Sequence, residues 1–177
     1  MNRSLVRIAG AAAWCLLIST LLNACAGYHL GSIPPKFMDG VHTVAVPTFT
    51  NDTLLPRLEV LGANSLIKQI QQDGTYRVVS AENADVIVSC RISDIRRHGA
   101  RSVKSDVLKQ SEFDLTVVVK YIVKKRSTGE DIHTGSTTGS TSFFVSGNDI
   151  NQDERQAIPL ALENAAVHMV SQLSEGW

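Results

Sequence analysis

The sequence contains few of the residue patterns on which catalysis depends. Its five histidines form no HxH or HExxH pair, so zinc ligation has no local signature. There is no G-x-S-x-G turn for a serine nucleophile, and no glycine-rich loop that leads into a phosphate-binding lysine. Acidic residues are scattered without an evident pair. We therefore expect no enzyme activity, no cofactor and no metal ion.

Long hydrophobic runs are also absent. The longest, residues 8–22, is mostly apolar and has 15 residues, whereas a spanning helix needs about 20. Arg3 and Arg7 precede it, and a short basic start followed by a short apolar run is the layout of a secretory signal. The run ends in Leu-Asn-Ala-Cys at residues 22–25.

The segment 22–25 resembles a lipobox, the site where bacteria diacylate a cysteine and cleave the chain before it. We predict a signal peptide over residues 1–24 and a mature chain that begins at lipidated Cys25. An uncleaved anchor or an ordinary secretory signal is the alternative. Two or more acyl chains, palmitate among them, give stable anchoring. Ala26, where Asp would favour the inner membrane, predicts sorting to the outer membrane, facing the periplasm.

The composition of the mature chain excludes further classes. Its 153 residues suit one ordinary domain, with 25–40 as lipidated N-terminus and tether and 41–177 as a single α/β sandwich domain. It keeps 15 basic against 17 acidic residues, a net charge of −2, which argues against nucleic acid as partner. Beyond Cys25 only Cys90 remains, so no intrachain disulfide can form, and we expect an inert core thiol.

Alternation of apolar and polar residues predicts the strands. It is clearest over 113–125 and recurs over 85–95, as in half-buried strands. After a turn at 127–129, residues 132–145 form the return strand, and their Ser, Thr and Gly content predicts a flexible, edge-like stretch. Residues 41–50 predict a first strand, and 76–79 a short one.

Two amphipathic helices complete the pattern. One begins near Pro56, which fits a first turn, and ends near Gly74. The other has Pro159 near its first turn, so residues 151–157 are expected to form a loop or a separate turn. The apolar stripes of the two helices comprise Leu58, Gly62, Leu66 and Ile70, and Ile158, Leu162, Ala165, Met169 and Leu173.

The order of these elements, β-α-β(β)-β-β-α, predicts an α+β fold. We expect a two-layer sandwich with two helices packed on one face of a four-stranded mixed sheet. The other face is then left for water or a partner.

The mature N-terminus resembles that of a known family, the LPS-assembly lipoproteins (LptE). The likeness begins with Cys-Ala-Gly-Tyr-His-Leu-Gly at residues 25–31. Segments similar to the family's first strand and helix entry are Ile33-Pro34-Pro35, Val44-Ala45-Val46-Pro47, Phe49, Asn51 and residues 53–59. Ala84-Asp85 before a strand and a last helix closing on Trp177 are also similar. The specific motifs lie in the first third of the mature chain.

The resemblance implies a non-catalytic outer-membrane lipoprotein that faces the periplasm. Such proteins plug and help assemble a large β-barrel, LptD, which places lipopolysaccharide in the outer leaflet. The alternative is an auxiliary lipoprotein of another envelope lipid-transport system, with a different partner for a similar domain. A lipid-anchored hydrolase is a third class, but it would need a catalytic cluster that the sequence does not display.

A basic cluster predicts where lipopolysaccharide could be contacted. Arg96, Arg97, Arg101 and Lys104 fall in the expected loop between the two long strands, and paired basic groups suit lipid A phosphates. An ordinary solvated loop is the alternative. A second basic group, residues 124–126, lies about 33 Å away along the strand, so one lipid would not use both clusters, and we favour the first.

Overall fold

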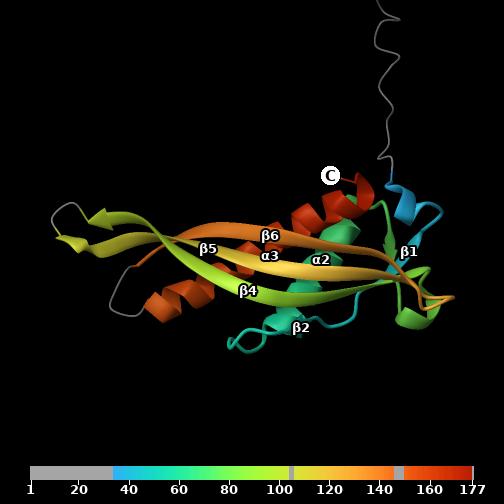
Figure 1. Ribbon diagram of the computed structural model, residues 1–177, viewed down its shortest axis with the longest axis horizontal. Coiled ribbons are helices and arrows are strands. Elements are labelled where there is room, and N and C mark those ends of the chain that lie inside the picture. The colour runs from blue at the N-terminus through green and yellow to red at the C-terminus, as the bar shows by residue number, and fades with distance from the viewer. Residues whose placement is uncertain (1–33, 104–105, 146–149, 177) are drawn as a thin grey trace, which may run out of the picture. The chain divides into compact units, whose positions relative to one another are not determined.

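The computed structural model describes residues 34–103, 106–145 and 150–176, with the side chains of 101–111 outside the described set. The predicted signal peptide, Cys25 and most of the predicted tether lie outside these residues. The elements in chain order are η2 (Lys36–Met38), β1 (Thr43–Ala45), β2 (Thr50–Asn51), α2 (Leu58–Asp73), β3 (Arg77–Val78), η3 (Ala81–Asn83), β4 (Val86–Val103), β5 (Asp106–Lys125), β6 (Asp131–Phe144) and α3 (Ile150–Ser174) (Figure 1).

The strands form one mixed sheet of six strands, not the four expected. Its order is β3-β1-β4-β5-β6, with β2 pairing with β4 off this path. β1 runs parallel to β3 and β4, while β4, β5 and β6 are antiparallel neighbours. The expected strand 41–50 divides into β1 and β2 around Pro47, because proline has no N–H to donate to a ladder.

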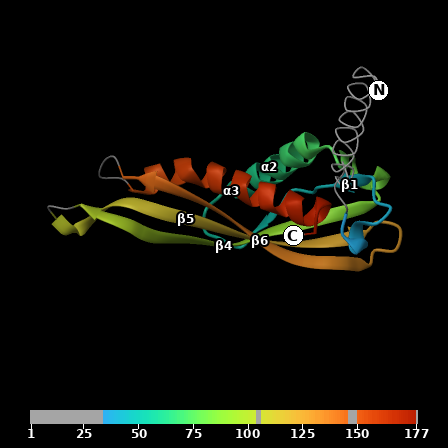
Figure 2. The ribbon, with the colours of Figure 1, turned by 90° about the horizontal axis from the view of Figure 1, so that it is seen from above.

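Both helices lie on one side of the sheet, as the sequence predicts (Figure 2). The predicted apolar faces of β4, β5, α2 and α3 meet in one core, and burying such side chains contributes roughly 25 cal/mol per Å² of apolar surface. Helix α2 ends as expected, because Gly74 adopts φ 77° and its N–H donates to the Ile70 carbonyl at 3.1 Å, a left-handed cap that glycine favours. The N-terminal η2 adds Met38, which is fully buried.

Helix α3 begins eight residues before the predicted start, so the expectation of a loop over 151–157 was wrong. Pro159 lies inside the helix, where it removes one backbone hydrogen bond. Contacts outside the helix compensate for this loss. Ile150 packs against the core, Ala157 is buried, and the Glu154 carboxylate pairs with Arg97 of β4. Local sequence rules do not see such tertiary contacts.

β6 is the edge strand that its composition predicts, and α3 closes part of that edge. The Asn164 amide donates to the Ser140 carbonyl at 2.7 Å, and Nδ1 of His168 donates to the Thr138 carbonyl at 2.9 Å. Gly139 lies between these two acceptors, and a Cβ there would overlap the backbone of α3. The missing side chain therefore permits the close approach of helix and strand.

Candidate functional site

The predicted basic loop is a continuation of two strands. β4 extends to Val103 and β5 begins at Asp106, so Arg96, Arg97 and Arg101 belong to β4, and the expectation of a loop there was wrong. Apolar alternation stops in this segment, but pairing with β5 continues from Ile95 to Val103. Strand structure here depends on the partner strand, which hydrophobic periodicity cannot reveal.

Arg96 and Arg97 are neighbours in a strand, so their side chains point to opposite faces of the sheet. A bulge in β4 decides which of the two faces the helices. The register shifts between Ile92, which pairs with Val119, and Asp94, which pairs with Val118. One extra residue reverses the faces to which later side chains point. Arg96 therefore shares the helix-free face with Thr116, its cross-strand partner.

Arg97 lies on the other face, toward α3. Its guanidinium pairs with the Glu154 carboxylate and lies 5.7 Å from the centroid of the Phe113 ring. The Glu154 side chain is only 15% exposed, so this pair holds the first turns of α3 against the sheet. Arg96 instead pairs with Asp94 at 2.7 Å, and both side chains are largely exposed.

The structure describes the side chains of two of the four predicted phosphate contacts, and these two do not share one surface. Arg96 and Arg97 point to opposite faces, the side chain of Arg101 is outside the described set, and Lys104 lies outside the described residues. Arg96 is the one described member with both an exposed side chain and an exposed partner.

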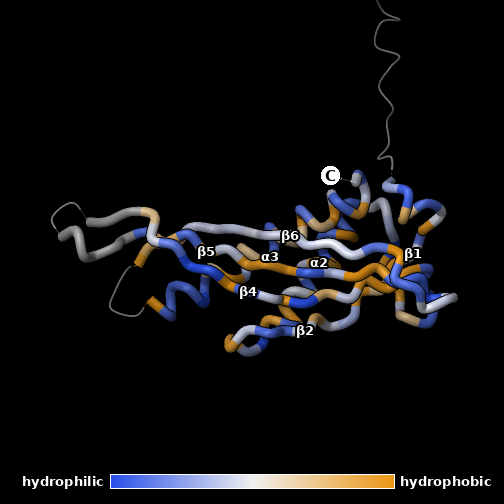
Figure 3. The backbone as a smooth tube through the Cα atoms, in the orientation of Figure 1, coloured by the Kyte–Doolittle hydropathy of each residue, from blue (hydrophilic) through white to orange (hydrophobic). Residues whose placement is uncertain are grey.

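The helix-free face is hydroxyl-rich and mixed in charge. Five exposed Ser and Thr residues follow each other at every second position of β6, which appears nearly neutral in Figure 3. They are Thr134, Ser136, Thr138, Ser140 and Ser142. Cross-strand contacts on this face include the Ser142 hydroxyl donating to Asp114 at 2.7 Å, and the hydroxyls of Thr116 and Ser140 3.1 Å apart.

A cavity of about 550 Å³ opens on this face, between the β1–β2 segment and strands β4 and β5. Asp52 lines it and pairs with Arg91 at 3.4 Å, with both side chains about half exposed. Lys120 and Ile122 of β5 also line it. Most of its lining surface is apolar, and its charged side chains, such as Asp52 and Arg91, are exposed rather than buried.

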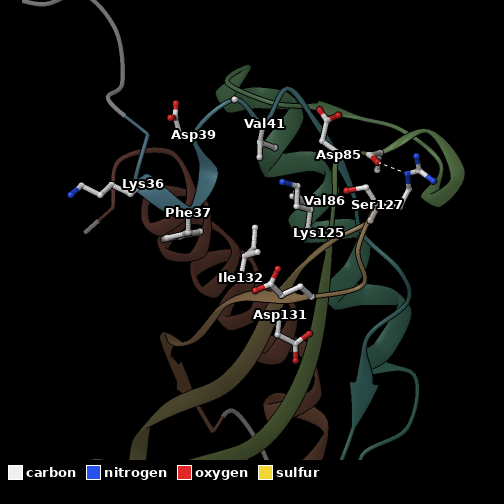
Figure 4. A pocket seen from close by; sticks show the side chains of 14 residues that line it. Lys36, Phe37, Asp39, Val41, Asp85, Val86, Lys125, Ser127, Asp131 and Ile132 are labelled. Carbon is white, nitrogen blue, oxygen red and sulfur yellow. Dashed lines mark hydrogen bonds between the residues drawn. The ribbon is translucent and has the colours of Figure 1, made fainter.

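The second basic group lies at the opposite end of the sheet and is already paired. Lys124 pairs with Asp131 at 2.9 Å, and Nε of Arg126 donates to the Ala84 carbonyl at 2.9 Å. Lys125 lines a cavity of about 570 Å³, shown in Figure 4. Acidic side chains from three segments line the same cavity, so it has no basic excess. They are Asp39, Asp85, Glu130 and Asp131.

Burial favours the neutral form of the titratable groups in the core. Burial raises the pKa of the Cys90 thiol, whose Sγ lies 3.8 Å from Sδ of Met169. Burial, with a smaller effect from Asp73, raises the pKa of Tyr76 to about 12. Among residues 34–103, 106–145 and 150–176, no three His, Cys, Asp or Glu side chains gather to hold a metal ion.

Asp85 serves the fold instead. Its carboxylate accepts hydrogen bonds from the backbone N–H groups of His42 and Thr43 at 3.0 and 2.9 Å, and from the Thr43 hydroxyl at 2.8 Å. These bonds lower the pKa of Asp85, that from the His42 N–H most. The carboxylate therefore ties β1 to the start of β4.

Sequence reasoning missed the Arg97–Glu154 pair and the bulge. A signal for the bulge was present: apolar residues occupy even positions from Val86 to Ile92, and the next one is Ile95. A break of phase within one strand is what an inserted residue produces. No comparable signal linked Arg97 to a helix more than 50 residues later.

In the part of the chain that the structure describes, no helix has the length and apolarity needed to cross a membrane. Solved structures share the fold. The PelC dodecamer from Paraburkholderia phytofirmans aligns with TM-score 0.51 and 14% identity over 81% of this chain and 94% of that one. A hypothetical protein from Chlamydia trachomatis gives 0.52 and 12% over 76% and 96%. A minor lipoprotein from Acinetobacter baumannii gives 0.50 and 16% over 76% and 91%.

No curated protein matches the sequence significantly. The model of one protein family does, and it is described as LptE, lipopolysaccharide-assembly. The match spans residues 41–173, from just before β1 almost to the end of α3. It therefore includes every strand, both helices and the basic segment of β4. This chain belongs to the LptE family of lipopolysaccharide-assembly proteins.

Proposed function

We propose that this chain is an outer-membrane lipoprotein that plugs and helps assemble the LptD-type β-barrel, which delivers lipopolysaccharide to the outer leaflet. The observation that carries the proposal is the family match over residues 41–173. The mature chain begins at Cys25, whose acyl chains hold the domain at the periplasmic side of the membrane. The domain acts by binding and carries out no chemistry.

The surface of the domain suits a partner that also contacts water. A plug needs a polar contact surface, because the interior of a large barrel is polar. The helix-free face offers hydroxyls and exposed ion pairs such as Arg91–Asp52. Exposed ion pairs contribute about 0–1 kcal/mol each, so a partner can exchange them at small cost.

Direct contact with lipopolysaccharide belongs to the proposal, with Arg96 as the leading residue. Its partner Asp94 is exposed, and releasing the guanidinium toward a phosphate costs little. Arg97 is committed to Glu154 and Phe113. Arg101 and Lys104 follow in the sequence, and they remain candidates from the sequence.

The proposal is tested by affinity purification of the lipidated protein from detergent-solubilised outer membranes, with bound proteins identified by mass spectrometry. We expect stoichiometric recovery of one large β-barrel of the lipopolysaccharide-assembly type. Recovery of inner-membrane transporter subunits would support the auxiliary-lipoprotein alternative. Recovery of no membrane partner would reject the plug.

The anchor has a matched control within the chain. Cys25→Ser should abolish incorporation of labelled palmitate and leave the precursor uncleaved, whereas Cys15→Ser should change neither. Loss of label from the Cys15 variant instead would move the anchor to that residue.

The lipid contact is tested in the purified complex. Arg96→Ala should lower the amount of co-purified lipopolysaccharide by about tenfold, because a hydrogen bond to a charged group contributes roughly 1.5–3 kcal/mol. Lys68→Ala is the control, since Lys68 is a similarly exposed cation on α2 that pairs with Glu163. Equal lipid recovery from the two variants would remove Arg96 from the site.

A further inference from the structure

The two halves of β4 differ in what lies along their outer edge. Up to Ile92 this edge is paired, because β1 aligns Val44 with Val86 and β2 aligns Asn51 with Ile92. Beyond Ile92, no strand within residues 34–103, 106–145 and 150–176 pairs with it. Figure 1 shows β4 continuing past β2 with β5 along one side and no strand along the other.

The direction of the backbone groups on this open edge follows from the register of the sheet. In antiparallel strands the N–H and C=O of one residue point to the same neighbour, and those of the next residue point the other way. On β6 the Thr138 and Ser140 carbonyls point away from β5, because α3 side chains reach them. Their partners on β5, Val118 and Thr116, therefore point toward β4.

Across β4 and β5, Asp94 pairs with Val118 and Arg96 with Thr116, so both residues of β4 bond to β5. Ile95, Arg97 and Gly99 must then direct their N–H and C=O groups outward. The paired half of the edge agrees with this assignment, because the carbonyl of Ile92, before the bulge, accepts the N–H of Asp52 at 2.9 Å. The bulge moves the outward positions from even to odd numbers.

A groove of about 530 Å³ runs beside these outward groups. One wall is the loop of residues 52–55, the other is the start of α3 with Glu154, and Ile95 and Arg97 lie along the edge. Leu54 stands in that loop with its side chain fully exposed. An exposed leucine beside unpaired backbone groups suits an extended chain that brings an apolar side chain of its own.

The charged side chains that could block this edge of β4 point to the two faces of the sheet instead. Charged side chains can block a free edge, but Arg97 is held by Glu154 on the helix side and Arg96 by Asp94 on the other face. The Arg97 carbonyl lies 3.2 Å from Nδ1 of the adjacent His98 ring, a local contact that an incoming strand can replace. By contrast, α3 itself covers the middle of the β6 edge.

We propose that an extended segment of the barrel partner adds as a strand to the β4 edge over Ile95–Gly99, with an apolar side chain against Leu54. This inference rests on the proposed function, and it names where and how the partner binds. Five residues of strand span about 17 Å, so the segment is short and Leu54 is a main side-chain contact. The backbone hydrogen bonds supply affinity, and the groove beside them selects the segment.

Gly99 permits a test on the backbone alone. Gly99→Pro removes an outward N–H without removing a bond to β5, and edge strands tolerate proline at such positions. Gly99→Ala keeps the N–H and is the matched control. Leu54→Asp tests the apolar contact, with Leu160→Asp as its control, because Leu160 is an exposed leucine on α3.

The experiment is affinity purification of each full-length lipidated variant from detergent-solubilised outer membranes, with circular dichroism of each. We expect Gly99→Pro and Leu54→Asp each to lower barrel recovery about tenfold, the effect of losing roughly 1.4 kcal/mol, and the two controls to keep it. If the wild type recovers the barrel and Gly99→Pro and Leu54→Asp recover as much of it, strand addition would be overturned. The proposed partner would still stand. Absence of the barrel from the wild type would overturn both.

If Gly99→Pro does not fold, a photo-crosslinking residue at position 54 tests whether the barrel binds beside the β4 edge. Crosslinks to one contiguous segment of the barrel, with none from position 160, are the expected result. Crosslinks from position 160 but not from 54 would place the contact on α3 and overturn the proposal.

Discussion

The β4 and β6 edges of the sheet differ because, in the part of the chain that the structure describes, side chains of α3 bond to the outward backbone groups of β6 but not to those of β4. Helix α3 starts beside β4, where Glu154 meets Arg97, and later runs along β6, where Asn164 and His168 reach its carbonyls. The β6 edge is closed there by side chains of the same chain. The β4 edge beyond Ile92 has no such cover from the described residues. A strand that the fold itself does not complete is where a partner can complete it.

The largest effect should come from breaking the closed edge at Gly139. In Gly139→Ala the new methyl group would overlap the Ala161 carbonyl oxygen and the Ala165 nitrogen, so α3 must move off β6. We expect a loss of about 3 kcal/mol in the free energy of unfolding, measured by urea denaturation. Ser140→Ala, whose side chain points to the helix-free face, should lose less than about 1 kcal/mol. Equal stability of the two variants would mean that α3 does not pack closely against Gly139 of β6.

The next effect concerns the far end of α3. The Tyr76 hydroxyl donates to the Leu173 carbonyl at 2.7 Å in the core, and Tyr76→Phe should cost roughly 1–2 kcal/mol. The folded pKa of Tyr76 is raised to about 12, against an ordinary value of 10.0. The neutral form is therefore favoured on folding, and its stabilisation is complete below pH 10 and falls as pH rises toward 12.

Urea titrations between pH 9 and 12 measure how the free energy of unfolding changes with pH in the wild type and in Tyr76→Phe. Tyr76→Phe should be less stable at pH 9 and lose less with rising pH. Tyr76→Phe should still lose some stability as pH rises, because burial also raises the pKa of Tyr121. Parallel slopes for wild type and Tyr76→Phe would contradict this account.

Opening the β6 edge should make it behave like the β4 edge. Replacing Asn164 and His168 by Ala removes two caps and should cost about 1 kcal/mol each. The freed carbonyls can then pair with another copy of the chain. Sedimentation velocity should detect concentration-dependent self-association in the double variant and not in Lys68→Ala. A strictly monomeric double variant would show that these caps do not protect the edge.

The smallest effect distinguishes the two neighbouring arginines. Arg97→Ala loses a pair with a poorly exposed carboxylate and a contact with the Phe113 ring, so we expect a loss of about 1 kcal/mol. Arg96→Ala loses only an exposed pair and should stay within roughly 0.5 kcal/mol of the wild type. Urea denaturation measures both free energies of unfolding, and the reverse order would mean that Arg96, not Arg97, faces the helices.

Much of the central fold was predictable because side-chain burial imposes periods of two and 3.6 on the sequence. Val117, Val119 and Val123 of β5 are buried as alternation requires, and so are Leu66 and Ile70 of α2. The Ser and Thr content of residues 135–141 identified the edge strand. The resemblance of the mature N-terminus pointed to the family that the match over 41–173 confirms.

The parts that sequence reasoning missed depend on contacts between distant segments. The turns of α3 before Pro159 need Arg97 and the core, and the outer half of β4 needs β5. The candidate site was affected most, because the inserted residue near Ser93 decides whether Arg96 or Arg97 faces the helices. Arg96 and Arg97, the two described members of the predicted cluster, lie on opposite faces because they are neighbours in a strand.

Amide hydrogen exchange, compared between the free protein and its complex with the barrel, tests the open β4 edge most directly. In the free protein the N–H groups of Ile95 and Gly99 should exchange fast, while those of Asp94 and Arg96 are protected by β5. In the complex, protection should appear at Ile95, Arg97 and Gly99, with no change at Thr138 and Ser140. Protection confined to β6, or to neither edge, would contradict the account.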